Sequence, residues 1–200
     1  MKHLVLGSAS PRRALLLRQL ELPFTTLPNP EAELIPATRI PAEYAIESAS
    51  AKTRAVMGLL TRQNQAENAI VIGADTIVCL DNAILGKPTD ATEAASMLHR
   101  LSGNVHQVYT GLVLQSGTTI HREAVCTEVE MNKFTSVDID TYVASGEPLD
   151  KAGAYGIQGL GARFIERING CYYNVVGLPL ARLCALLGAM GYNLNDKTPQ

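Results

Sequence analysis

The sequence predicts an α/β fold, and its size and composition support this. The 200 residues are 46% hydrophobic and carry a net charge of −2, values typical of one ordinary soluble domain. A chain of this length buries enough surface to need no disulfide scaffold. With no Trp and only 3 Phe, the apolar content comes mainly from Ala, Leu, Val and Ile. That mixture is typical of strands packed against helices.

The first part of the chain alternates between strand and helix signals. Residues 4–7 predict a short buried strand, and Ser10 followed by Pro11 is a typical start for a helix that runs to Leu20. Residues 22–41 contain five prolines and predict an extended loop that carries Glu31 and Glu33.

The middle of the chain predicts a long helix followed by the most apolar strand. Residues 42–60 have helical apolar spacing, with Lys52 in the middle, and residues 63–68 form a polar break. Residues 70–80 then predict a strand with Asp75 at its centre, and Asp81-Asn82 indicates a hairpin turn after it.

The next region predicts a helix, two strands and another helix. Residues 90–101 read as a helix in which Asp90 and Glu93 stand at the spacing of a capping box. Residues 105–114 and 120–131 alternate as two strands around Ser116-Gly117, and Ser136 is expected to cap a helix that ends at Gly146.

Glycine is unusually dense in the last third of the chain. Seven of the 16 glycines fall between residues 146 and 177, which indicates tight turns or backbone that approaches a ligand. Residues 163–168 and 171–176 flank Asn169-Gly170 and predict a hairpin. Residues 179–190 predict the last helix, and residues 192–200 are expected to fray.

Charge and composition exclude several classes of protein. Lys plus Arg number 17 against 19 Asp plus Glu, so no basic field attracts nucleic acid or an anionic membrane. No apolar stretch approaches the roughly 20 residues that span a bilayer, and the first residues do not resemble a signal peptide. We therefore expect a cytoplasmic protein. Scattered cysteines without a C-x-x-C pair are expected to be small buried side chains, and the histidines to be structural or superficial: Cys79, Cys126, Cys171, Cys184, His3, His99, His106 and His121.

The loop before the first helix has the residues of a phosphate-binding site. Ser8, Ser10, Arg12 and Arg13 surround a helix start, where free backbone N–H groups and guanidinium groups favour an anion. The alternative is that both arginines are solvated at the surface and Ser10 merely caps the helix. The loop lacks the Walker A sequence.

Asp75 is the oddest placement in the chain. A carboxylate inside an apolar strand needs a metal ion, a cation or several donors to offset its desolvation. We expect three companions for Asp75. Glu33 would be a further acid that binds a hard divalent cation, and Lys52 and Lys87 would be basic side chains that bind phosphate oxygens. The alternative is that Asp75 lies at the end of a strand and caps a turn.

Residues 145–159 combine flexible backbone with polar side chains that could grip a planar ligand. Gln158 offers both a donor and an acceptor, as the imide edge of a pyrimidine requires. The alternative is a glycine-rich surface loop.

Five motifs in one order resemble the Maf family of nucleoside triphosphate pyrophosphatases. They are Ser-Ala-Ser-Pro-Arg-Arg from residue 8, Gly-Ala-Asp-Thr at 73–76, Gly-Lys-Pro at 86–88, Leu-Ser-Gly-x-x-His-x-Val-x-Thr-Gly at 101–111 and Asp-Lys-Ala-Gly-Ala-Tyr-Gly-Ile-Gln-Gly at 150–159. The resemblance runs from residue 4 to about residue 187. It implies an elongated α/β domain over residues 1–200, with a mixed twisted sheet flanked by helices and two lobes around a central cleft, distantly like inosine triphosphate pyrophosphatase.

The resemblance also implies an activity and a set of roles. The activity is hydrolysis of a nucleoside triphosphate to the monophosphate and diphosphate, with Mg²⁺, Mn²⁺ or Co²⁺ as the cofactor. With Gln158 and the plain Ser-Pro-Arg-Arg loop, the sequence resembles the branch of the family that acts on dTTP and UTP. CTP and modified pyrimidine nucleotides are further candidate substrates. Asp75 matches the proton acceptor. Arg12, Thr76 and Gln158 match positions for base selection, Ser8, Arg13, Lys52 and Lys87 match phosphate-binding positions, and Glu33 and Asp75 are the implied metal ligands.

Two other classes of function remain open from the sequence. One is a regulator of cell division that binds nucleotide without essential turnover. The other is a nucleic-acid-binding module, which the net charge and the lack of interleaved basic and aromatic residues disfavour. A homodimer is common for such folds and is expected here.

Overall fold

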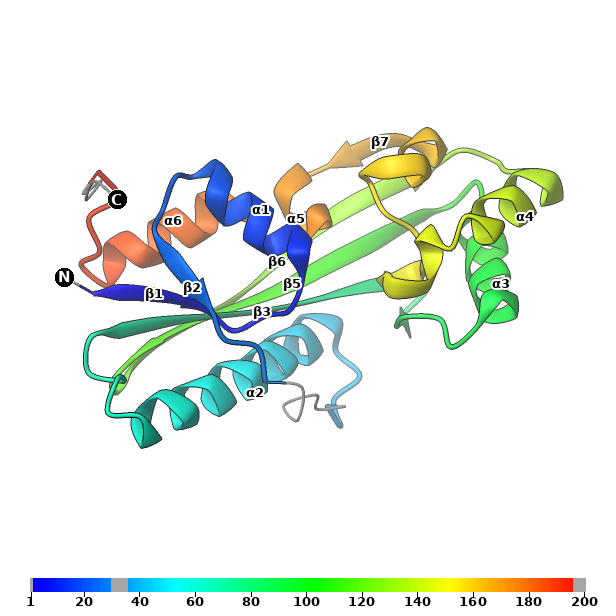
Figure 1. Ribbon diagram of the computed structural model, residues 1–200. Helices are drawn as coiled ribbons and strands as arrows, with labels where there is room; N and C mark the ends of the chain where they lie inside the picture. The colour runs from blue at the N-terminus through cyan, green and yellow to red at the C-terminus, as the bar shows by residue number, and fades with distance from the viewer. Residues whose placement is uncertain (1, 30–35, 196–200) are drawn as a thin grey trace.

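The computed structural model describes residues 2–29 and 36–195, and the described chain forms one mixed sheet flanked by helices (Figure 1). The sheet has seven strands in the order β2-β1-β3-β5-β6-β7, with β4 paired to β3. β1 runs parallel to β2 and β3, and the other pairings are antiparallel. The α/β prediction is therefore confirmed. The strands are β1 His3–Leu6, β2 Phe24–Thr26, β3 Ala69–Leu80, β4 Ala83–Leu85, β5 Val105–Ser116, β6 Thr119–Met131 and β7 Ile165–Asn169.

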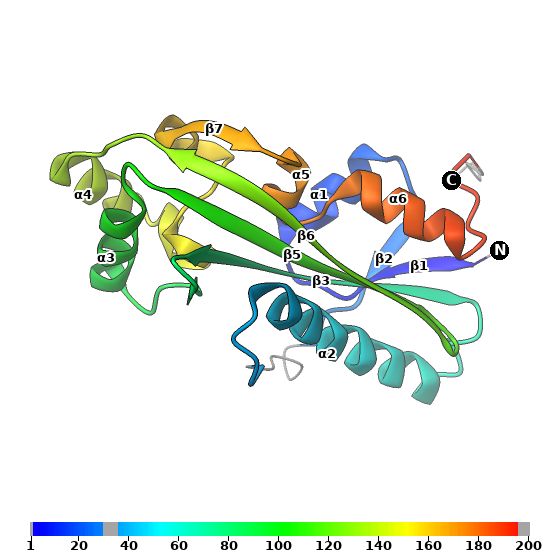
Figure 2. The same cartoon turned by 180° about the vertical axis from the view of Figure 1, so that it is seen from behind.

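The helices divide the molecule into two lobes along the sheet. In Figures 1 and 2, α2 covers one face of the sheet, α1 and α6 cover the other, and α3 and α4 gather at the far end. The helices are α1 Pro11–Gln19, α2 Pro41–Arg62, α3 Ala91–Leu101, α4 Ser136–Ala144, α5 Tyr172–Val176 and α6 Leu180–Ala189. Three 3₁₀ turns, η2 Glu147–Asp150, η3 Ala152–Ala154 and η4 Gly159–Phe164, lie in the glycine-rich region.

Each lobe has its own apolar core, and the long strands β3 and β5 run through both. One cluster packs α1 and α6 against the sheet through residues such as Leu17, Leu112 and Leu183. A second packs α3 and α4 at the far end, around Leu98 and Tyr142. A smaller cluster joins α2 to β1 and β3. The predicted two-lobe arrangement is therefore present.

Several local predictions are confirmed by the backbone. Ser10 is the N-cap of α1 and accepts a hydrogen bond from the Arg13 N–H. The turn between β3 and β4 places Asp81 and Asn82 at φ angles of 50° and 64°, the left-handed conformation that two-residue hairpins of this kind require.

Two predicted helix caps are wrong in detail. Asp90 does cap α3, but the Glu93 carboxylate accepts from the backbone and hydroxyl of Thr89 instead of completing a capping box. Thr135, and not Ser136, caps α4, in a full capping box with Asp138. Thr135 prevails because its side chain and that of Asp138 satisfy two helix-end N–H groups reciprocally.

Two predicted elements are also wrong. Residues 22–41 are not all loop, because residues 24–26 form β2, which pairs in register with β1. Residues 171–176 are not the second arm of a hairpin, because residues 172–176 form α5 and β7 pairs with β6 instead. Buried contacts of Asn174 hold this helix, and they override the strand propensity of its neighbours.

The cysteine prediction holds only for Cys79, which is buried. Cys126 is exposed and Cys171 and Cys184 are half-buried, so the prediction is wrong for these three. Cys126 lies on β6 in register with the half-buried Tyr109.

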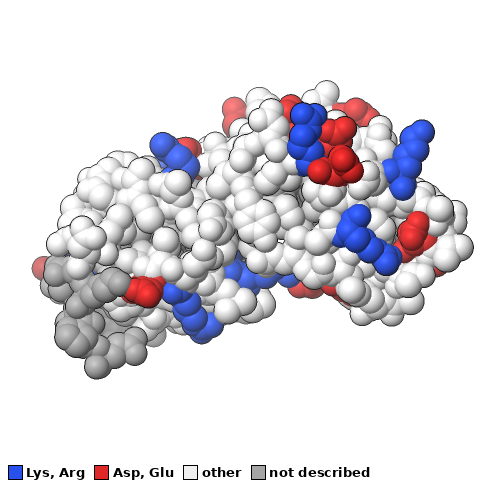
Figure 3. Space-filling view, turned by 90° about the horizontal axis from the view of Figure 1, so that it is seen from above, with Lys and Arg blue, Asp and Glu red and all other residues white. Residues whose placement is uncertain are grey.

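The described surface carries mixed charge. On the face shown in Figure 3, acidic and basic side chains are interspersed and most of the surface is uncharged. Among the described residues, no helix combines the length and the apolar content needed to cross a bilayer. In the tail predicted to fray, Tyr192 is buried and residues 196–200 lie outside the described residues.

Candidate active site

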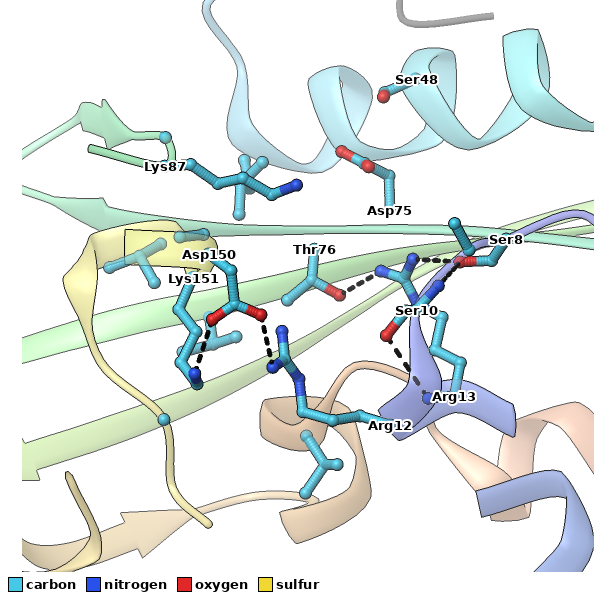
Figure 4. A pocket seen from close by; sticks show the side chains of 18 of the residues that line it. Ser8, Ser10, Arg12, Arg13, Ser48, Asp75, Thr76, Lys87, Asp150 and Lys151 are labelled. Atoms are coloured by element: carbon cyan, nitrogen blue, oxygen red, sulfur yellow. Dashed lines mark hydrogen bonds and ion pairs between the residues drawn. The ribbon is translucent and has the colours of Figure 1, made fainter. Parts of the chain in front are cut away.

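The site lies where the sheet has a free edge. β1 pairs with β3 only as far as Ile72, and β4 pairs with β3 only from Val78 onward. Within the described chain, residues 73–77 of β3 therefore have a strand partner on the β5 side alone. A cleft of about 960 Å³ opens at this edge (Figure 4).

The cleft brings together predicted site residues from five parts of the chain. The lining includes Ser8, Arg12, Arg13, Lys52, Asp75, Thr76, Lys87 and Gln158. Glu33, the other predicted metal ligand, lies outside the described residues.

Asp75 and Thr76 leave β3 on opposite faces of the sheet, because neighbouring side chains on a strand alternate. Figure 4 shows Asp75 on the side of α2 and Thr76 on the side of Arg12 and Asp150. The cleft therefore has two chambers that meet at the free edge of β3.

The α2 chamber contains the acid and two lysines. Lys52 Nζ forms an ion pair with Asp75 Oδ1, and both side chains keep about a fifth of their surface exposed to the cleft (21% and 18%). Lys87, which follows β4, extends toward Asp75 in Figure 4. The carboxylate is thus aimed into the cleft and paired there, so the alternative of a turn-capping Asp does not describe it.

Close contact between α2 and the sheet places Lys52 beside Asp75. A Cβ on Gly73 would lie 2.0 Å from Thr53 Oγ1, and one on Gly111 would lie 2.1 Å from the Ala45 carbonyl oxygen. Glycine at these two strand positions lets the helix approach the strands that carry and flank Asp75.

Arg13 is a buried cation at the junction of the two chambers. Only 8% of its surface is exposed, and it donates to Gly177 O, Ser8 Oγ and Thr76 Oγ1 at 2.8, 3.0 and 3.0 Å. Burial lowers its pKa, while the charge of Asp75 acts in the opposite direction. Among the described residues it has no ion pair, so Arg13 is not the solvated surface arginine of the alternative reading. Its remaining guanidinium N–H groups suit an anion.

Arg12 reaches across the cleft to the other lobe. Its Nη1 lies 3.1 Å from Asp150 Oδ2, and Lys151 Nζ lies 2.6 Å from Asp150 Oδ1. Burial acts to raise the pKa of Asp150, but hydrogen bonds from Lys151 and Arg12 outweigh it and the net shift is downward. Asp150 is therefore held as a carboxylate between two cations.

A hydrogen-bond chain fixes Thr76 in the second chamber. Thr76 Oγ1 accepts from Arg13 and lies 2.9 Å from Thr110 Oγ1, which in turn donates to the Asn174 carbonyl at 3.0 Å. Thr110 and Asn174 are fully buried. Thr110 and Asn174 thus hold the Thr76 hydroxyl in place, although neither of them lines the cleft.

The glycine-rich segment is ordered by buried polar contacts. His106 Nε2 lies 2.7 Å from Tyr155 Oη, and Tyr142 Oη donates to Glu147 Oε1 at 2.9 Å. Gly153 and Gly159 adopt φ angles of 68° and 78° in its turns. The segment that carries Gln158 is therefore part of the cleft wall and is packed on the second core.

The sequence reasoning did not identify three polar residues of the site. Tyr44 and Ser48 line the cleft and stand eight and four residues before Lys52 on α2. Their helical spacing from Lys52 was the available signal. Thr110 stands in the motif at 101–111, but only its strand pairing with Thr76 reveals that it reaches the site.

The described donor set fits a magnesium-like ion only with help from a ligand. No group of three or more His, Cys, Asp or Glu side chains within the described residues could hold a metal by itself. Mg²⁺, however, is often bound by one or two carboxylates together with waters and substrate phosphates. The cleft-facing carboxylate of Asp75 suits that mode of binding.

Fold and site together define an α/β protein with a cleft suited to a phosphorylated ligand. The family model described as "Maf-like protein" matches residues 3–190. Among the curated relatives, a dTTP/UTP pyrophosphatase of Clostridium botulinum (strain Okra / Type B1) is 45% identical over 197 residues, which covers 97% of this chain and 100% of the relative. The dTTP/UTP pyrophosphatases of Pelotomaculum thermopropionicum and Bacillus cytotoxicus are 47% identical over 197 residues and 48% identical over 183 residues. Those two alignments cover 97% and 92% of this chain and 100% and 93% of the relatives.

The chain belongs to the Maf family, as the five motifs predicted.

Proposed function

We propose that this protein is a nucleoside triphosphate pyrophosphatase that hydrolyses dTTP and UTP to the monophosphate and diphosphate. Relatives that carry this activity in their names align with nearly the whole chain. The observation that carries the proposal is the cleft itself, in which Asp75 faces Lys52 and Lys87 while the buried Arg13 lies at the other side of the same strand edge.

The phosphates occupy the cationic part of the cleft in this proposal. Ser8, Arg13, Lys52 and Lys87 bind the phosphate oxygens, and the start of α1 adds the positive end of its helix dipole. A phosphate that approaches Lys52 competes with Asp75 for its ammonium group. Substrate binding therefore releases the carboxylate at the moment when it is needed.

Asp75 is the proton acceptor in the proposed reaction. Its freed carboxylate orients a water molecule and takes its proton as the water oxygen attacks the α-phosphorus. The bond from the α-phosphorus to the bridging oxygen breaks, and diphosphate leaves with the bonding electrons. Lys52 and Lys87 stabilise the charge that develops on this leaving group.

A divalent cation, held by Asp75 and by Glu33 beyond the described residues, would neutralise phosphate charge when bound. This role for Mg²⁺, Mn²⁺ or Co²⁺ follows from the family implication and from the donor chemistry of the Asp75 carboxylate. The protein groups alone supply the phosphate contacts and the proton acceptor described above.

The second chamber reads the base in this proposal. Thr76 and Arg12 lie together on that side of the sheet in Figure 4, and Gln158 lines the same cleft. The Gln158 amide has one acceptor and two N–H donors, which can pair with the imide edge of thymine or uracil.

A diphosphate-release assay tests the activity. The panel contains dTTP, UTP, CTP and purine triphosphates, each with and without Mg²⁺, Mn²⁺ or Co²⁺. We expect diphosphate release from dTTP and UTP. The nearly isosteric Asp75→Asn should lower turnover about 10²- to 10⁴-fold. Wild-type turnover in a folded Asp75→Asn protein would exclude Asp75 as the proton acceptor.

The same assay distinguishes an enzyme from a nucleotide-binding regulator. Tight binding of dTTP without diphosphate release under any metal condition would support the regulator. For base selection, Gln158→Glu should lower kcat/KM for UTP and dTTP more than for a purine triphosphate. Equal losses on both would separate Gln158 from base recognition.

A further inference from the structure

One carboxylate, that of Glu147, holds the backbone on both sides of Gln158. Its two oxygens accept hydrogen bonds from the N–H groups of Leu160 and Gly161 at 2.9 and 3.2 Å, two and three residues after Gln158. Oε1 also accepts from the Tyr142 hydroxyl at 2.9 Å, and that hydroxyl accepts from the Gly156 N–H at 3.2 Å, two residues before Gln158.

Glycines let the segment approach this carboxylate closely. A Cβ on Gly159 would lie 2.7 Å from Glu147 Oε2, and a Cβ on Gly161 would lie 2.6 Å from the Tyr142 hydroxyl. Gly159 also has a φ of 78°, which disfavours any side chain there. Part of the glycine density noted in the sequence therefore serves contact with Glu147 and Tyr142.

In these contacts the Glu147 carboxylate acts only as a hydrogen-bond acceptor, so the side chain must be ionised. Burial acts to raise the pKa of Glu147, but the hydrogen bonds from Leu160, Tyr142 and Gly161 prevail and lower it. An amide at this position presents one oxygen and one NH₂ group, so at least one of the three donors would face another donor. Replacing one carboxylate oxygen by an NH₂ group therefore disturbs the backbone on at least one side of Gln158.

We infer that Glu147 is a positioning residue for base selection, acting through Gln158. Residues 156–161 curve around the carboxylate, and Gln158 at the centre of this segment lines the cleft. Glu147 itself is absent from the cleft lining and so acts on substrate only through the segment it holds. This inference rests on the proposed function, because it concerns the base of the nucleotide that the cleft binds.

A double-mutant cycle tests the inference on the full-length protein. Glu147→Gln should lower kcat/KM for UTP about 10- to 100-fold, mainly through KM, because displacement of a positioning group by about 1 Å costs up to about 10²-fold. In a Gln158→Ala background the same Glu147→Gln change should alter kcat/KM less than about twofold. Glu67→Gln, at an exposed glutamate away from the cleft, is the matched control and should retain wild-type values.

A second variant keeps the test decisive if Glu147→Gln fails to fold. Tyr142→Phe removes the hydroxyl that joins Gly156 to the carboxylate but leaves the Leu160 and Gly161 contacts. It should raise KM for UTP in the same direction by a smaller factor, and this rise should also vanish in the Gln158→Ala background.

The outcomes separate this inference from the proposed function. Equal losses from Glu147→Gln with and without Gln158 would overturn it, as would an unchanged KM for UTP in both single variants. If the wild-type protein binds UTP but releases no diphosphate, the proposed function fails. The double-mutant cycle is then measured with Kd for UTP. Additive effects of Glu147→Gln and Gln158→Ala on Kd would overturn the inference, and non-additive effects would support it.

Discussion

Acid should destabilise this protein through His106, which is buried inside the far lobe. The residue is 2% exposed, Nε2 lies 2.7 Å from Tyr155 Oη, and Nδ1 is buried without a hydrogen-bond partner among the described residues. Tyr155 covers it edge-on, with the ring centroids 5.3 Å apart. Burial lowers the pKa of His106 from 6.5 to about 4.

The direction of this effect follows from proton uptake. Between about pH 6.5 and pH 4 the unfolded chain binds a proton at His106 that the folded chain does not bind, so stability falls as pH falls. The stabilisation is complete above about pH 6.5 and is lost progressively toward pH 4. At about 1.4 kcal/mol per pKa unit the whole effect is about 3 kcal/mol, and about 2 kcal/mol is lost between about pH 7 and pH 4.5.

Urea denaturation of the wild type and of His106→Gln at these two pH values measures the effect. Glutamine does not titrate and can still reach the Tyr155 hydroxyl, so the variant retains the acid response of every other group. We expect the wild-type free energy of unfolding to fall about 2 kcal/mol further than that of the variant on acidification. Parallel losses in the two proteins would refute the reasoning.

Two further predictions concern glycines and use the free energy of unfolding. Gly111→Ala should cost about 3 kcal/mol or more, because the new Cβ would lie 2.1 Å from the Ala45 carbonyl oxygen of α2. Gly86→Ala is its control, since nothing lies within 4 Å of that Cβ, and a similar loss in both variants would contradict the steric explanation. Gly188→Ala, in an exposed and open position of α6, should raise stability by about 0.5 to 1 kcal/mol and Tm by a few degrees. An unchanged or lower Tm would contradict this.

Local rules were sufficient for the parts of the fold that depend on neighbours in sequence. Ser10 and Pro11 mark the start of α1, and Asp81-Asn82 marks the β3–β4 turn, because each motif satisfies its own backbone. The unusual position of Asp75 in an apolar strand also indicated a site, since an isolated carboxylate there would be costly to bury. All three signals can be read from a few adjacent residues.

Tertiary contacts decided the parts that the sequence did not predict. The segment Cys-Tyr-Tyr-Asn-Val-Val at 171–176 favours a strand by propensity. It forms α5 because the side-chain NH₂ group of Asn174 donates to Val108 O and Thr127 Oγ1, at 3.0 Å each, and the backbone carbonyl of Asn174 accepts from Thr110. Two strands far away in sequence supply these partners, so no local pattern could indicate them. The β3–β5 pairing brings Thr110 next to Thr76, and the contact with Asn174 holds the Thr110 hydroxyl there.

The alternation of β3 also separates the two tasks of the proposed enzyme. Asp75 and Thr76 are adjacent, yet they serve opposite faces of the sheet, so a nucleotide that meets both must cross the free edge of β3 between Ile72 and Val78. A shift of β3 by one residue would exchange the faces of the acid and the hydroxyl. Gly73 resists such a shift, because any other residue in its place would strike Thr53 and the Ala49 carbonyl of α2. The packing of α2 thus fixes the strand register on which the proposed proton transfer and the proposed base selection both depend.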